Sequence, residues 1–204
     1  MSTEVINIIC NMDMKKIQSQ LVLQCAPLIV GLKVSNLFVT EPKYLRALRI
    51  ILKRSDLSFY VLTSTENKVT CFIFREKALE AFLNKKENQC LLKSMGYNEN
   101  LSLTQKMYEF RRRYRSYQEG LTGFPHEMGV FLGYPAEDVI GFIEKKGQRY
   151  LYSGYWKVYE DVDTKKEIFE MYEIAKESLV CLLAGGLSIV EIIEAFCGQH
   201  KMAA

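Results

Sequence analysis

The sequence predicts an α+β fold, in which a small mixed or antiparallel sheet with a β-hairpin packs against several helices. Two β-rich runs, residues 57–63 and 68–74, are separated only by residues 64–67, a spacing typical of an antiparallel hairpin. Helical patterns outnumber strand patterns elsewhere, and strands do not alternate one for one with helices. This arrangement favours an α+β fold over a doubly wound parallel sheet.

Helices are predicted where apolar residues recur at three- and four-residue steps. The most periodic segment carries an aromatic stripe of Met107, Phe110, Tyr114, Tyr117 and Leu121. The predicted helices cover residues 13–23, 40–54, 75–83, 87–95, 104–119, 135–146, 164–183 and 188–196.

Local signals indicate where several of these helices begin and end. We expect the first to end before Pro27, because proline disfavours helical geometry in the preceding residue. Thr40 is the expected cap of the second helix, and Pro135 is expected to lie in the first turn of another. Ser188 and Glu191 have the spacing of a capping box and predict the start of the last helix.

Three further segments are predicted to be strands. Residues 34–39 are apolar and follow a turn, and residues 129–133 form a short apolar run between two glycine bends. In residues 148–159 bulky side chains alternate, as in a strand with two unlike faces.

The length of 204 residues predicts a single globular domain over residues 1–204, with residues 162–204 as a helical portion packed on it. A net charge of +3 is too small to argue for nucleic acid as a partner. No apolar run approaches the roughly 20 residues of a spanning helix, and no signal peptide is recognisable, so we expect a cytoplasmic protein without a membrane partner. A small molecule is a candidate partner, while the cofactor and oligomeric state stay unknown.

The six cysteines do not show the spacing of a metal site, so we predict mostly free thiols and assign no metal-ligating residues, while the presence of a bound metal stays open. Cys71, Cys90, Cys181 and Cys197 fall at apolar positions and are interpreted as buried filler. Cys25 has two interpretations. Backbone N–H groups of a following turn, with Lys33 nearby, would lower its pKa and make it a nucleophile or soft ligand. A buried thiol beside a chain bend explains the same pattern and is favoured by the spacing alone.

The second candidate is His126 followed by Glu127. Histidine acts as a general base or metal ligand, and flexible glycines at 123, 129 and 133 surround the pair. Adjacent residues of a strand face opposite ways, so the two side chains are not expected to touch. A hydrogen-bonded loop histidine with a solvated glutamate is the equally weighted alternative.

Aromatic residues around 152–159 suggest a wall for a planar ligand, with Tyr155 and Trp156 as rings and Lys157 as the contact for an anion. A sheet surface covered by helices would use the same rings as core. The basic residues 111–113 resemble an RNA-binding helix face, but a solvated face opposite an aromatic stripe explains them as well.

Three blocks together resemble a bacterial family known as domain of unknown function 3793. The resemblance spans about residues 21–172, and the blocks are residues 24–38, 124–139 and 154–159. It implies membership but no reaction. The family pattern has histidine where Gln24 stands and often cysteine where Ser153 stands, which places in doubt any mechanism that needs a His–Cys pair at 24 and 25.

Two functional hypotheses follow from these residues. The first is a thiol-dependent enzyme or cofactor-handling protein whose pocket joins the Cys25 turn to the His126 loop, with Lys33 or Lys157 as the anion contact. Under it, Cys25, His126 and Glu127 are the candidate catalytic residues. The second is a non-catalytic binding or regulatory module for a planar ligand, a nucleic acid or a protein partner.

Overall fold

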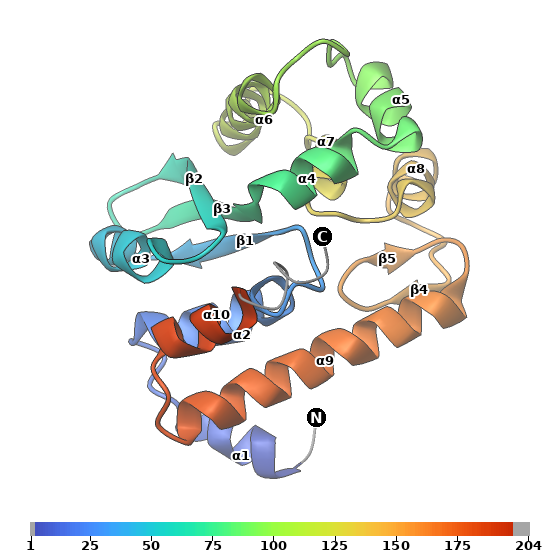
Figure 1. Cartoon of the computed structure of the whole chain (residues 1–204). Helices are drawn as coiled ribbons and strands as arrows, with labels where there is room; N and C mark the ends of the chain where they lie inside the picture. The colour runs from blue at the N-terminus through green and yellow to red at the C-terminus, as the bar shows by residue number, and fades with distance from the viewer. Residues whose placement is uncertain (1–2, 198–204) are drawn as a thin grey trace. The chain divides into compact units, whose positions relative to one another are not determined.

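The computed structural model describes residues 3–197 and has the predicted α+β fold. The chain forms two compact units (Figure 1). The first comprises the chain up to Arg75 and from Ile168 on, and the second is Glu76–Glu167. The expectation of one domain over residues 1–204, with a helical portion from 162, therefore stays a prediction.

The first unit contains a three-stranded antiparallel sheet. Its strands are β1 (Ser35–Thr40), β2 (Leu57–Ser64) and β3 (Val69–Arg75), in the order β1-β3-β2. The predicted hairpin of β2 and β3 and the predicted strand near residue 35 are both confirmed. Because β3 lies between the other two strands, it is buried along almost its whole length.

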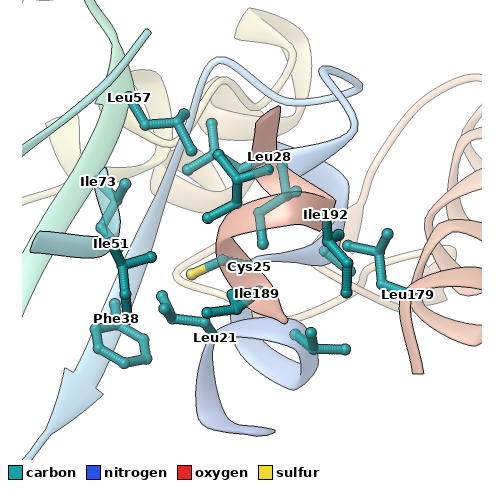
Figure 2. Close-up of a cluster of buried hydrophobic side chains, with 14 of the residues drawn as sticks. Leu21, Cys25, Leu28, Phe38, Ile51, Leu57, Ile73, Leu179, Ile189 and Ile192 are labelled. Carbon is teal, nitrogen blue, oxygen red and sulfur yellow. The ribbon is translucent and has the colours of Figure 1, made fainter. Parts of the chain in front are cut away.

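Helices pack on this sheet to form the core of the first unit. They are α1 (Thr3–Asn11), α2 (Ile17–Ile29), the short 3-10 helix η1 (Pro42–Tyr44), α3 (Leu45–Leu52), most of α9 (Val162–Ala184) and α10 (Ile189–Cys197). Figure 2 shows apolar side chains of α2, α3, α9 and α10 gathered against those of the sheet. Among residues 3–197, no helix combines the length and apolarity needed to cross a membrane.

The end of α2 differs from the prediction. The helix continues to Ile29 with Pro27 inside its last turns, rather than ending near residue 23. Proline removes one backbone donor, but two helix-end carbonyls are satisfied elsewhere, because the Arg75 guanidinium donates to Leu28 O at 3.2 Å and Ile29 O at 2.8 Å. Burial of the apolar side chains around Pro27 also favours the helical conformation.

Two cap predictions have different outcomes. Thr40 does not cap a helix, because its hydroxyl bonds Gln20 Oε1 at 2.6 Å and the chain enters η1 two residues later. The capping box of α10 is confirmed: Ser188 N donates to Glu191 Oε2 at 2.8 Å, and Glu191 N donates to Ser188 Oγ at 3.3 Å.

The second unit is built mainly from short helices around an aromatic core. Its elements are α4 (Glu76–Leu83), α5 (Lys86–Ser94), α6 (Leu103–Gln118), α7 (Glu127–Phe131), α8 (Ala136–Glu144), β4 (Tyr152–Ser153), β5 (Lys157–Val158) and the first residues of α9. Phe110 of α6 stacks on Phe131 of α7 with ring centroids 4.4 Å apart. The predicted stripe of α6 is buried at Phe110 and Tyr114, but Leu121 lies beyond the helix and is 73% exposed.

Two predicted strands of this unit are wrong. The apolar run at 129–133 is the end of helix α7 and the turn after it, because a short apolar run has no period that separates a buried strand from a helix. The strand predicted over 148–159 is a hairpin of two short strands, β4 and β5, with Gly154, Tyr155 and Trp156 between them.

Candidate functional site

A cavity of about 310 Å³ lies within the second unit, among α7, α8 and the segment that contains β5. Its apolar wall consists of Phe124, Met128, Leu132, Val139 and Phe142. Ligand pockets in proteins measure about 300–1,000 Å³ and are lined mostly by apolar side chains with a few polar groups. The size and lining of this cavity therefore suit a small ligand.

Glycines let the chain turn and approach closely around the cavity. Gly133, which separates α7 from α8, has a φ of +76°, a conformation that favours glycine. Gly141 of α8 packs against Tyr159 so closely that a Cβ would lie 2.5 Å from Cγ of the tyrosine ring. Helix α8 can therefore contact the chain after β5 only because residue 141 has no side chain.

Asp138 joins α8 to the segment of β5. Its carboxylate is 2% exposed and accepts two hydrogen bonds, each 2.7 Å long. The donors are the indole Nε1 of Trp156 and the backbone N–H of Tyr159. The first of these bonds fixes the indole, which stacks on Tyr134 with ring centroids 4.9 Å apart and an angle of 27° between planes. The two stacked rings both line the cavity.

The negative charge of Asp138 is compensated inside the protein. It lies in the first turn of α8, where the helix dipole favours a carboxylate. Lys165, itself 5% exposed, donates to Glu137 at 2.6 Å. Although burial works to lower it, the pKa of Lys165 is raised, because that bond and the nearby charges of Glu137, Asp138 and Asp161 stabilise the ammonium.

His126 is the residue before α7 and lines the cavity. Its ring contacts two phenylalanines, with centroids 5.5 Å from that of Phe124 and 5.8 Å from that of Phe142. Within the part of the chain that the structure describes, its buried Nδ1 has no hydrogen-bond partner. A buried polar atom without a partner costs about 1–3 kcal/mol, so this atom favours a ligand that completes the bond.

Lys157 of β5 also lines the cavity and is half-buried. Its Nζ donates to the carbonyl of Gly147 at 2.6 Å and lies 4.9 Å from the ring centroid of Tyr150 and 5.8 Å from that of Phe142. Cation–π contacts of this kind hold the ammonium in place. Among residues 3–197, it forms no ion pair with a carboxylate.

Glu127 follows His126 directly but is not among the residues that line the cavity. Its carboxylate, 4% exposed, accepts from Tyr97 Oη at 3.3 Å and from Arg113 Nη1 at 3.5 Å. Arg113 also donates to Met95 O at 2.6 Å and to Glu109. Burial and the negative charge of Glu127 raise the pKa of Tyr97. Glu127 is thus held by a partly buried network that joins α6, α7 and the chain after α5.

Two of the three residues expected to bind a planar ligand line the cavity. Trp156 and Lys157 do so, whereas Tyr155 lies in the turn between β4 and β5 and is not part of the lining.

Cys25 and Lys33 lie in the first unit. Cys25 is 1% exposed, and its sulfur is surrounded by apolar side chains of the core (Figure 2). Asn36 links the two residues: its Nδ2 is 3.8 Å from Cys25 Sγ, and its Oδ1 accepts from Lys33 Nζ at 2.9 Å. Burial raises the pKa of the Cys25 thiol to about 12. This agrees with the buried thiol that the spacing favoured and not with the lowered pKa of the alternative interpretation. Burial also lowers the pKa of Lys33 to about 8.

The candidate residues therefore form two groups in different units. Cys25 and Lys33 are together in the first, and His126, Trp156 and Lys157 are together in the second. A pocket that joins the Cys25 turn to the His126 loop stays a prediction, as do the catalytic roles of Cys25, His126 and Glu127. Gln24 stands where the family pattern has histidine. Its side-chain amide donates to Val39 O at 3.0 Å and accepts from Val39 N at 2.9 Å.

The remaining cysteines divide by exposure. Cys71 is buried, as predicted, and burial raises its pKa to about 11. The prediction that Cys90 and Cys181 are buried is wrong, because both are exposed on their helices. Cys197 is partly buried and donates to Asp56 at 3.1 Å.

Tyr134, Asp138 and Phe142 are among the lining residues that were not predicted to belong to a site. Asp138 had a clear local explanation as an acid in the first turn of a helix. Its bond to Trp156 joins positions that are 18 residues apart, and no local pattern indicates such a contact. Phe142 lies at an apolar position of the same helix, where core packing is the ordinary interpretation.

The comparisons with known proteins give one match. The family model described as "Protein of unknown function (DUF3793)" matches residues 21–193, which include the sheet, the cavity and most of α10. No curated protein and no solved structure gave a match.

Proposed function

This chain belongs to the family of proteins of unknown function DUF3793, and we propose that its second unit is a non-catalytic binding module for a small planar molecule. The observation that carries the proposal is the combined lining of the cavity. Stacked rings of Tyr134 and Trp156 lie among apolar side chains, and the unpartnered Nδ1 of His126 supplies a polar contact.

The rings favour a flat ligand. Offset-stacked aromatic pairs contribute about 0.5–1.5 kcal/mol beyond the burial of their area. The indole of Trp156 is held by Asp138, so it need not be immobilised when a ligand stacks on it. A preorganised ring loses less side-chain freedom on binding, and more of the contact energy appears as affinity.

The polar groups near the cavity favour binding over catalysis. Both oxygens of Asp138 already accept hydrogen bonds from the protein, and Glu127 is occupied by Tyr97 and Arg113. General acid–base catalysis needs a group within hydrogen-bond reach of the substrate. His126 lines the cavity with an available Nδ1, but among residues 3–197 the lining includes no serine, threonine or cysteine that this imidazole could activate as a nucleophile. The thiol-dependent hypothesis stays a prediction that labelling of Cys25 tests.

The chain offers a specific reporter, because Trp156 is its single tryptophan and lines the cavity. The test is a titration with 2-naphthol and with decahydro-2-naphthol, a saturated compound of similar size, followed by calorimetry and by Trp156 fluorescence. We expect 2-naphthol to bind roughly five- to tenfold more tightly, as one stacked ring pair contributes. Absence of binding, or equal affinity for the two compounds, would contradict the proposal.

A matched pair of variants locates the bound molecule. Leu132→Phe adds volume to the lining of the cavity, and Leu151→Phe makes the same change at a position that is 64% exposed and outside the lining. We expect the first to weaken 2-naphthol binding and the second to leave it unchanged. Thermal melts followed by circular dichroism verify that both variants are folded.

A further inference from the structure

The geometry points to a ligand that carries a carboxylate, which pairs with Lys157 while the planar body lies against the rings. This inference rests on the proposed function and names the ligand class of the same cavity. Its basis is the charge of the lining: one ammonium without an acidic partner, and one carboxylate whose charge is already compensated.

Lys157 is held in position but not neutralised. One of the three ammonium protons is used by the carbonyl of Gly147, and the ammonium lies over the rings of Tyr150 and Phe142. In the described residues no carboxylate forms an ion pair with it. An ammonium that is partly removed from water loses part of its hydration, and an opposite charge compensates for that loss. An anionic ligand would supply the missing partner.

Asp138 does not oppose such a ligand as strongly as an unpaired carboxylate would. Its two oxygens accept from Trp156 Nε1 and Tyr159 N, each at 2.7 Å, so no acceptor oxygen is left without a donor. The ammonium of Lys165 and the start of α8 also stabilise its negative charge. The uncompensated charge of the lining is therefore positive.

His126 and Lys157 can contact the same molecule. The Lys157 Nζ and the His126 ring centroid each lie 5.8 Å from the ring centroid of Phe142. Both polar groups thus lie near the same lining ring, and the stacked rings of Tyr134 and Trp156 line the same cavity. This arrangement fits an aromatic carboxylate whose acid group meets Lys157 and whose ring carries a hydrogen-bonding group for His126.

The test compares 2-naphthoate with 2-naphthamide, which has nearly the same shape but no charge, by calorimetry at low ionic strength. We expect wild-type protein to bind the acid roughly tenfold more tightly, as charge-assisted hydrogen bonds contribute. Lys157→Gln keeps a donor for Gly147 but removes the charge. We expect it to lower affinity for 2-naphthoate roughly tenfold and to change affinity for 2-naphthamide less than about twofold.

Two further variants complete the design. Lys157→Arg keeps the positive charge and should restore the preference for the acid. Lys166→Gln is the matched control, because Lys166 also lies over a ring, that of Tyr152 at 5.4 Å, but does not line the cavity. It should leave both affinities unchanged.

The possible outcomes separate this inference from the proposed function. If wild-type protein binds amide and acid equally, or if Lys157→Gln weakens both equally, the carboxylate inference is overturned while planar binding stands. If neither compound binds, the proposed function fails and the inference fails with it. The wild-type comparison needs no variant, so it decides the question even if Lys157→Gln does not fold.

Discussion

The indole Nε1 of Trp156 donates a hydrogen bond of 2.7 Å to Oδ2 of the buried Asp138. This bond connects α8 to the β4–β5 hairpin and orients the ring that stacks on Tyr134. The other oxygen of Asp138 accepts from the backbone N–H of Tyr159. One carboxylate therefore binds both the Trp156 side chain and the Tyr159 backbone. The shape of the cavity therefore depends on Asp138, although its carboxylate is engaged with the protein.

Replacing Asp138 with asparagine should destabilise the second unit. An amide keeps one acceptor oxygen, but its NH₂ group faces an N–H donor, and a buried hydrogen bond to a charged group is lost. We expect a loss of about 1–3 kcal/mol in the free energy of unfolding. Urea unfolding followed by Trp156 fluorescence measures it. Emission of the folded variant should also shift, because the indole loses its partner.

Asp163→Asn is the control for this change, since Asp163 is exposed in the first turn of α9. It should alter stability by no more than a few tenths of a kcal/mol. Equal effects of the two variants would show that the bond to Trp156 does not contribute to stability.

Thiol reactivity should follow exposure. Thiolates are the reacting species, and burial raises the pKa of Cys25 to about 12 and that of Cys71 to about 11. Brief treatment with iodoacetamide near pH 7.5, followed by peptide mass spectrometry, should modify the exposed Cys10, Cys90 and Cys181 first. Cys25 and Cys71 should react only after addition of denaturant.

The same measurement tests the thiol-dependent hypothesis. A catalytic Cys25 would be the most reactive thiol of the folded chain. Selective modification of Cys25 in the absence of denaturant would contradict the expected pattern and support that hypothesis.

Lys33 should make stability depend on pH in the alkaline range. Burial lowers its pKa from 10.5 to about 8, so between these values the unfolded chain binds more protons than the folded one. Stability therefore increases as pH rises from 8 to 10.5, by at most about 3 kcal/mol, and this contribution is constant below pH 8. Lys33→Met should abolish the increase.

Urea unfolding at pH 7 to 10.5 checks this expectation. It is followed by circular dichroism rather than by fluorescence, because Trp156 lies in the second unit and Lys33 in the first. The raised pKa of Cys25 has the opposite effect above pH 9, where only the unfolded chain loses the thiol proton. Both proteins contain Cys25, so the difference between wild type and Lys33→Met reports Lys33 together with its charge interaction with Cys25. Lys53→Met, at an exposed position, is the control. A pH profile of Lys33→Met parallel to wild type would refute the assignment.

Elements with strong local signals were predicted correctly. The hairpin of β2 and β3 follows from two β-rich runs and a four-residue connection, and α10 begins at its capping box. Helix α7 and the short strands β4 and β5 were not, because a run of few apolar or aromatic residues fits either a helix or a strand. Pro27 gave a local signal for a helix end that burial and the Arg75 cap override.

For the candidate site, residue chemistry indicated His126, Trp156 and Lys157, and all three line one cavity. Their roles there stay predictions. Cys25 had the chemistry of a nucleophile, but a thiol's reactivity depends on what surrounds it. The apolar side chains around it come from segments as distant in sequence as Phe38 and Ile189.

The sequence by itself determined the α+β class, the hairpin, most helix boundaries and the block that contains the cavity residues. These depend on periodicity, caps and turns, which act over a few neighbouring residues. Only the tertiary structure decided that Asp138 bonds Trp156, that Glu127 joins Tyr97 and Arg113, and that Cys25 is buried. Burial and hydrogen-bond partners depend on contacts between distant segments, and local spacing carries no record of those contacts.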